Sequence, residues 1–100
     1  MTTFYAAFLQ PGSLWDKNKT TREQPFWDEH ADYMDSLFDT GVIILAGPYA
    51  DRTGSMVIVK AEDANQVREM FRNDPWTTKD VLKVADVKEW IIFLDRRNGS

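Results

Sequence analysis

The feature that most constrains this chain is the order of its apolar runs and its segments with helical periodicity. Apolar runs of strand length favour buried β-strands, whereas apolar residues spaced three and four apart favour amphipathic helices. In chain order they are 4–9 (strand), 25–38 (helix), 42–46 (strand), 55–60 (strand), 61–73 (helix) and 81–94 (strand). The order β-α-β-β-α-β is typical of a ferredoxin-like α+β fold, in which two helices cover one face of a four-stranded antiparallel sheet.

Proline and glycine mark where the two helices should begin and end. Pro25 can occupy the first turn of the first helix, and Gly41 follows its last apolar residue as a C-cap. Asp74 precedes Pro75, and a residue before proline is pushed out of the helical region. The second helix should therefore end at Asp74.

The connections are predicted from their turn residues. Residues 42–60 form a hairpin, with a break at Gly47–Pro48 and a turn at 50–54. Residues 77–79 form a connector before the last strand. The polar loop at 10–23 is long for a small domain, and such loops are usually functional or mobile.

The chain has the size of one domain and a sheet that needs covering on both faces. Its 100 residues, 43% of them hydrophobic, support a single domain over 1–100, with a tail at 95–100. The strand residues at 42–46 and 90–94 are apolar on both faces. Because two helices cover only one face, we expect a homodimer with sheets packed face to face.

Charge and composition exclude several classes of partner. The net charge is −4 without a basic stripe, which argues against binding nucleic acid or an anionic membrane surface. The absence of cysteine excludes disulfides and thiol chemistry and fits a cytoplasmic location. The N-terminal residues show no signal-peptide pattern, and no apolar run is long enough to span a bilayer.

The single histidine, His30, lies on the apolar side of the first predicted helix. It is the only side chain whose unperturbed pKa lies near neutrality, so it is the first candidate for proton transfer. The predicted topology brings His30, Asp74, the Gly47–Pro48 turn and the loop that carries Trp15 to the same end of the domain. These groups could therefore share one cleft.

Other chemistries lack the residues they need. With one histidine and no cysteine, a zinc site is not expected, so we predict no metal. No glycine-rich loop precedes a helix in a nucleotide-binding pattern, and no serine stands in a nucleophile elbow. The sequence thus favours chemistry without a cofactor.

Four short motifs together resemble the YCII-related family, and the resemblance covers about residues 4–94. They are His30, Gly47-Pro48, Gly54-Ser55 and Asp74-Pro75-Trp76. The resemblance implies a ferredoxin-like fold that forms dimeric α+β barrels and uses a His–Asp pair. It also implies relatives that act on halogenated hydroxyquinones or resemble muconolactone isomerases. The chain departs from the pattern at Arg22, which is too far from His30 for the anion-binding role of a family basic residue.

Three readings of the chain remain open. In the first, it is a cofactor-independent lyase or isomerase for a small cyclic or aromatic substrate, with His30 as acid and base and Asp74 orienting it. In the second, it binds a small ligand without turnover. In the third, His30 and Asp74 are structural, as a core histidine and a helix terminator. The expected substrate-binding residues are Trp15, Gly47, Pro48, Arg52, Ser55 and Trp76.

Overall fold

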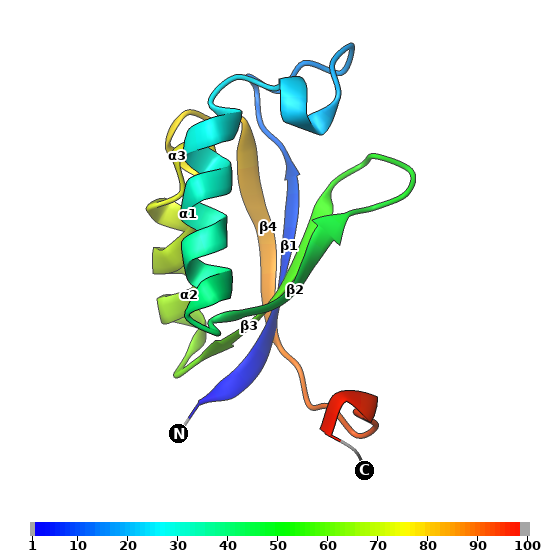
Figure 1. The fold of residues 1–100 in the computed structure, drawn as a ribbon, viewed down its shortest axis with the longest axis vertical. Helices are drawn as coiled ribbons and strands as arrows, with labels where there is room; N and C mark the ends of the chain where they lie inside the picture. The colour runs from blue at the N-terminus through cyan, green and yellow to red at the C-terminus, as the bar shows by residue number, and fades with distance from the viewer. Residues whose placement is uncertain (1, 99–100) are drawn as a thin grey trace.

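The strands and long helices follow one another in the predicted order in the computed structural model, which describes residues 2–98 (Figure 1). The elements are β1 (Thr3–Pro11), α1 (Trp27–Asp39), β2 (Ile43–Pro48), β3 (Ser55–Ala61), α2 (Ala64–Arg72), α3 (Pro75–Thr78) and β4 (Leu82–Glu89). Single turns of 3₁₀ helix add Thr21–Glu23 and Arg96–Asn98. No helix in this part of the chain is long and apolar enough to cross a membrane.

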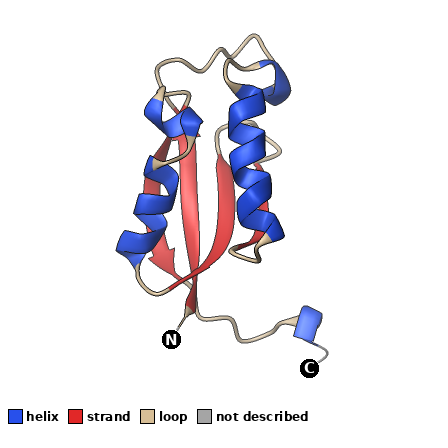
Figure 2. Cartoon of the chain, turned by 60° about the vertical axis from the view of Figure 1, so that its left-hand side comes forward, coloured by secondary structure: helices blue, strands red, loops and turns tan. Residues whose placement is uncertain are grey.

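The four strands form one antiparallel sheet in the order β2-β3-β1-β4. Pairs such as Ala7↔Val57 and Ala7↔Val87 place β1 in the centre of the sheet. The three α-helices lie over one face of this sheet (Figure 2). The predicted ferredoxin-like α+β fold is therefore confirmed.

Strand alternation and the amphipathic face of α2 produce the core between sheet and helices. Ala7 and Leu9 of β1, together with Val59 of β3, point toward the helices and are buried. Val67 and Phe71, one helical turn apart on α2, belong to the same buried cluster as these strand residues. Burying such side chains stabilises the fold by about 1.5–3 kcal/mol each, so this layer fixes the position of α2 on the sheet.

The opposite face of the sheet carries apolar side chains that no helix covers. Leu45 of β2 pairs with Ile58 of β3, and both alternate with residues that face the core. Leu45 is 55% exposed and Met56 is 38% exposed. The sheet thus has a helix-covered face and an open, partly apolar outer face.

The last strand is shorter than the sequence predicts. β4 ends at Glu89, whereas the apolar run up to Leu94 was expected to continue it. Its final contact with β1 is the bond from the Trp90 backbone N–H to the Phe4 carbonyl, because β1 itself begins at Thr3. Without a partner strand the run leaves the sheet, and Phe93 is 91% exposed. Within the predicted tail, residues 99–100 lie outside the described part of the chain.

Smaller corrections concern the ends of other elements. α1 begins at Trp27, because Phe26 adopts a left-handed conformation with φ of 62°, so Pro25 precedes the helix rather than opening it. The second strand runs past the predicted 42–46 and ends with Gly47 and Pro48, which close it as expected. The expected connector at 77–79 lies largely within α3, a short helix that starts at Pro75.

Candidate active site

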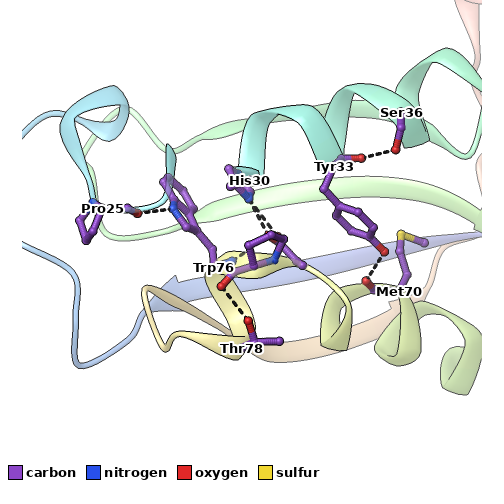
Figure 3. A network of polar contacts seen from close by, with 9 residues as sticks. Pro25, His30, Tyr33, Ser36, Met70, Trp76 and Thr78 are labelled. Carbon is purple, nitrogen blue, oxygen red and sulfur yellow. Dashed lines mark hydrogen bonds and ion pairs between the residues drawn. The ribbon is translucent and has the colours of Figure 1, made fainter. Parts of the chain in front are cut away.

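His30 and Asp74 form a buried pair between α1 and the turn that opens α3. Nδ1 of His30 lies 2.9 Å from Oδ1 and 3.0 Å from Oδ2 of Asp74. His30 stands in the first half of α1 and points toward α3 (Figure 3). The side chains are 11% and 2% exposed, so little water reaches the contact.

The carboxylate of Asp74 is fixed by its own local structure. Asp74 is the N-cap of α3, and its Oδ1 accepts a hydrogen bond of 3.0 Å from the backbone N–H of Trp76. Its carbonyl accepts bonds from Thr77 and Thr78, and its own N–H donates to Phe71. Capping residues of this kind are held in one orientation. The local structure around Asp74 therefore fixes the position from which its carboxylate contacts His30.

This contact determines which nitrogen of the neutral His30 ring carries the proton. A carboxylate only accepts hydrogen bonds, so Nδ1 must donate, and Nε2 of the neutral ring then has a free lone pair. Within residues 2–98, no group hydrogen bonds to Nε2. A carboxylate on Nδ1 also stabilises the imidazolium that forms when Nε2 takes a proton. The pair has the geometry of a general base.

A cavity of about 380 Å³ opens beside the exposed edge of His30. Besides His30 itself, every residue expected to bind substrate lines it: Trp15, Gly47, Pro48, Arg52, Ser55 and Trp76. Asp74 lies behind the histidine rather than in the wall, and Arg22 is absent from the lining. The structure thus brings together residues from the first loop, α1, the β2–β3 hairpin and α3, as the topology predicted.

Three tryptophans make one side of this cavity aromatic. The Trp15 and Trp76 rings meet edge to face at 5.8 Å between centroids. Trp27 is tilted against Trp76 at 5.6 Å and against His30 at 5.8 Å. Trp27 was not among the expected site residues, although its position one turn before His30 on the apolar helix face could have indicated it.

Arg52 lies in the turn of the β2–β3 hairpin and is one of two charged residues in the lining, with Asp35. Its backbone is left-handed, with φ of 66°, and its guanidinium donates to the carbonyl of Lys19 at 3.1 Å. The hairpin is thereby tied to the first loop across the cavity. A cation in this wall can attract an anionic group in a bound molecule.

Gln24 organises the first loop and was missed by sequence reasoning. It is 3% exposed, and its amide oxygen accepts from the backbone N–H of Asp16 at 2.8 Å. Its amide nitrogen donates to the carbonyls of Asp16 and Lys19 at 2.7 and 3.2 Å. The Gln24 side chain thus satisfies loop backbone groups that have no partner in a helix or sheet. It stabilises the loop segment that carries Trp15 into the cavity wall. A lone glutamine in a polar loop gives no sequence signal for this role.

The three tyrosines have different surroundings. Tyr5 is in the core and Tyr49 lines the cavity, while the hydroxyl of Tyr33 donates to the carbonyl of Met70 at 2.7 Å (Figure 3). Burial raises the pKa of Tyr33, and the nearby negative charge of Asp74 raises it further. Tyr33 therefore stays neutral beside the carboxylate.

The described residues contain no group of three or more histidine, cysteine, aspartate or glutamate side chains that could hold a metal ion. The donor set around His30 consists of one imidazole and one carboxylate already bonded to it. Such a pair is suited to moving a proton.

Comparison with known proteins identifies a family and a solved structure that is similar to this chain. A family model described as the YCII-related domain matches residues 4–91. No curated protein matches the chain. Among solved structures, the chain is similar to 5-chloro-2-hydroxyhydroquinone dehydrochlorinase (TftG) from Burkholderia phenoliruptrix AC1100, in complex with 2,5-dihydroxybenzoquinone. The TM-score is 0.57 at 19% identity, and the match covers 95% of this chain and 98% of that one.

Proposed function

The chain belongs to the YCII-related family, and from this premise we propose that it is a cofactor-independent lyase or isomerase for a small cyclic or aromatic substrate. The observation that carries the proposal is the bond of 2.9 Å between Nδ1 of His30 and Asp74, made while the same ring lines the cavity. A purely structural histidine would not need to line a cavity. The arrangement supports a base with an oriented, charge-stabilised ring.

In the proposed reaction, Nε2 of His30 removes a proton from a carbon or oxygen atom of the substrate. The electron pair that is released either expels a leaving group from a neighbouring carbon, which is elimination, or is reprotonated elsewhere, which is isomerisation. The resulting imidazolium keeps its Nδ1–H on Asp74. After elimination it releases the proton from Nε2 to solvent as the leaving group departs as an anion, and in isomerisation it delivers that proton to another atom of the substrate. One positioned acid–base group of this kind accelerates a reaction by about 10²–10⁴.

The walls of the cavity support the substrate class. Flat aromatic side chains favour flat ring systems, which bury large apolar faces against them. Arg52 would attract an oxyanion on such a ring. The dehydrochlorinase of similar fold is named for a chlorinated hydroxyquinol and was solved with 2,5-dihydroxybenzoquinone. These two compounds are therefore the first probes for this chain.

The test is turnover of 5-chloro-2-hydroxyhydroquinone, followed by chloride release, together with binding of 2,5-dihydroxybenzoquinone followed by tryptophan fluorescence. Trp15, Trp27 and Trp76 all lie at the cavity, so a bound quinone should quench them. His30→Ala should lower turnover by about 10²–10⁴ while circular dichroism shows an intact fold. Undiminished turnover in His30→Ala would contradict the proposal.

Binding without turnover would instead support the alternative, a non-catalytic small-ligand module of the same fold. Arg52→Gln tests ligand binding separately from proton transfer, because it removes the cation and leaves His30 and Asp74 in place. We expect this variant to bind 2,5-dihydroxybenzoquinone more weakly. Unchanged binding would remove Arg52 from the proposed anion contact.

We also propose that two copies pack through their outer sheet faces, as in a dimeric α+β barrel. The support is the apolar outer face, where Leu45 and Met56 stay exposed in a single copy, and the resemblance to a family that forms such dimers. Sheets commonly pack face to face about 10 Å apart through apolar side chains. The second copy would cover what the helices leave open.

The dimer is tested by Leu45→Glu in sedimentation analysis. A buried unpaired carboxylate at the interface should turn the dimer into a monomer. Phe38→Glu is a matched control, since Phe38 on α1 is 60% exposed but lies away from the outer face. A wild-type monomer, or equal effects of both variants, would contradict the face-to-face dimer.

A further inference from the structure

The indole of Trp76 is stacked flat against the imidazole of His30. The ring centroids are 3.8 Å apart and the planes differ by 4°. The other aromatic contacts in this cluster are tilted or edge to face, with centroids 5.6–5.8 Å apart. Trp76 is itself buried, so its ring is a fixed surface and not a mobile cover.

Trp76 is anchored at both ends. Its indole Nε1–H donates to the carbonyl of Pro25 at 2.8 Å, just before α1 (Figure 3). Its backbone N–H donates to Oδ1 of Asp74, the oxygen that also faces Nδ1 of His30. Because Pro75 restricts the backbone between them, the carboxylate and the indole form one rigid unit.

We propose that Trp76 is a positioning residue for His30, which holds the imidazole plane so that Nδ1 faces Asp74 and Nε2 faces the cavity. The proposal rests on the proposed function, because a fixed direction of Nε2 matters only if that atom transfers a proton. It changes the expected role of Trp76 from contacting the substrate to orienting the base.

The geometric reason lies in the torsions of histidine. The outer torsion of its side chain is broad and has no sharp rotamer minimum. A parallel stack restricts the ring to one plane and leaves two orientations, related by a half-turn. Only one of them places Nδ1 on Asp74. The stack and the carboxylate therefore specify a single ring orientation together, and neither does so alone.

The experiment uses the fact that His30 is the only histidine, so ¹⁵N-histidine labelling of the full chain gives one set of ring signals. In the wild-type protein we expect an upfield ring-current shift of the carbon-bound His30 ring protons. We also expect a protonated Nδ1 with a downfield proton signal. Absence of the ring-current shift would overturn the proposal without any variant.

Trp76→Leu should abolish the upfield shift, and the Nδ1–H signal should be lost as the ring turns away from Asp74. Trp76→Phe keeps a stacking ring without the indole donor and should restore the Nδ1–H signal. Trp27→Leu is the matched control, because it removes a tilted neighbour of His30 without removing the stack.

A merely structural tryptophan gives a different result. Trp76→Leu would then lower the melting temperature, as Trp27→Leu would, with the Nδ1–H signal of His30 unchanged, and the proposal would fail. These measurements need no substrate. Their failure is therefore distinct from failure of the proposed reaction, which is shown by undiminished turnover in His30→Ala.

Discussion

Nδ1 of His30 lies within 3.0 Å of both carboxylate oxygens of Asp74, although 44 positions separate the two residues in the chain. The carboxylate is held by the backbone N–H of Trp76, so it approaches the ring from a fixed direction. The negative charge therefore acts on one edge of the imidazole, and the opposite nitrogen, Nε2, is the atom that would exchange a proton in the proposed reaction. The fixed orientation of the Asp74 carboxylate and its negative charge can be tested separately.

Replacing Asp74 by asparagine removes the negative charge but keeps an oxygen in the same position. The amide oxygen of Asp74→Asn can still accept the Nδ1–H bond, but it carries no charge to stabilise the imidazolium. We expect kcat/KM for 5-chloro-2-hydroxyhydroquinone to fall by less than in His30→Ala, for which about 10²–10⁴ is expected. If Asp74→Asn lost as much as His30→Ala, the charge would be as essential as the base.

Asp74→Ala should also lower the free energy of unfolding. It leaves two buried donors without an acceptor, Nδ1–H of His30 and the backbone N–H of Trp76. An unsatisfied buried polar group costs about 1–3 kcal/mol. Urea denaturation should therefore show a clear loss in the free energy of unfolding relative to Asp74→Asn. Equal stability of the two variants would contradict this account.

Tyr33 predicts how stability changes at alkaline pH. Burial, and then the charge of Asp74, raise the pKa of Tyr33 above its usual value of about 10. The contribution of this proton to stability is complete below the usual tyrosine pKa and is lost as pH rises toward the raised pKa.

In Tyr33→Phe this part of the alkaline loss should vanish, while the lost bond to the Met70 carbonyl costs about 1 kcal/mol at neutral pH. Ultraviolet titration checks the second cause. The most alkaline tyrosinate transition should move to lower pH in Asp74→Asn, and an unmoved transition would show that burial alone raises the Tyr33 pKa.

Replacement by alanine should destabilise the protein at one of two glycines that line the cavity and have almost no effect at the other. A Cβ at Gly54 would lie 2.2 Å from the Leu9 carbonyl oxygen, where β1 and β3 pair, whereas a Cβ at Gly47 meets nothing within 4 Å. We expect Gly54→Ala to destabilise by about 1–3 kcal/mol. Gly47→Ala should stay within about 0.5 kcal/mol. Denaturant midpoints of the two variants measure the difference directly, and similar values would contradict the close approach at Gly54.

Gln24→Ala should loosen the first loop. Its amide bonds to Asp16 and Lys19 have no substitute, so the backbone there opens to water. Hydrogen exchange should become faster at 16–20, and 2,5-dihydroxybenzoquinone should bind more weakly because Trp15 loses its support. Gln10→Ala, at an exposed position on β1, is the control and should change neither.

The sequence predicted the fold and the end of the domain where the candidate site lies, because periodicity and topology depend on residue order alone. It overextended β4 past Glu89, since the apolar residues up to Leu94 read as a strand and the loss of a pairing partner depends on where β1 begins. The length of β4 depends on where its partner strand β1 begins, so the apolar pattern of the β4 segment alone does not determine it.

Within the candidate site, the sequence predicted that His30 and Asp74 lie together but not which side chains and backbone groups surround them. The stack of Trp76 on His30 depends on side-chain torsions and on the anchor to the Pro25 carbonyl. The role of Gln24 depends on backbone carbonyls that turn inward in the loop. Both are three-dimensional arrangements of groups that have no spacing signature in the chain.

The strand order has a consequence for when the site can exist at all. If the chain is divided at the 50–54 turn, β1 and β2 belong to the first half and β3 and β4 to the second. In the order β2-β3-β1-β4 every hydrogen-bonded ladder joins strands from different halves. Neither half can form even a two-stranded sheet, and each holds one member of the His30–Asp74 pair. During synthesis, the His30–Asp74 contact can therefore form only late, and two separately expressed halves should form it only on mixing.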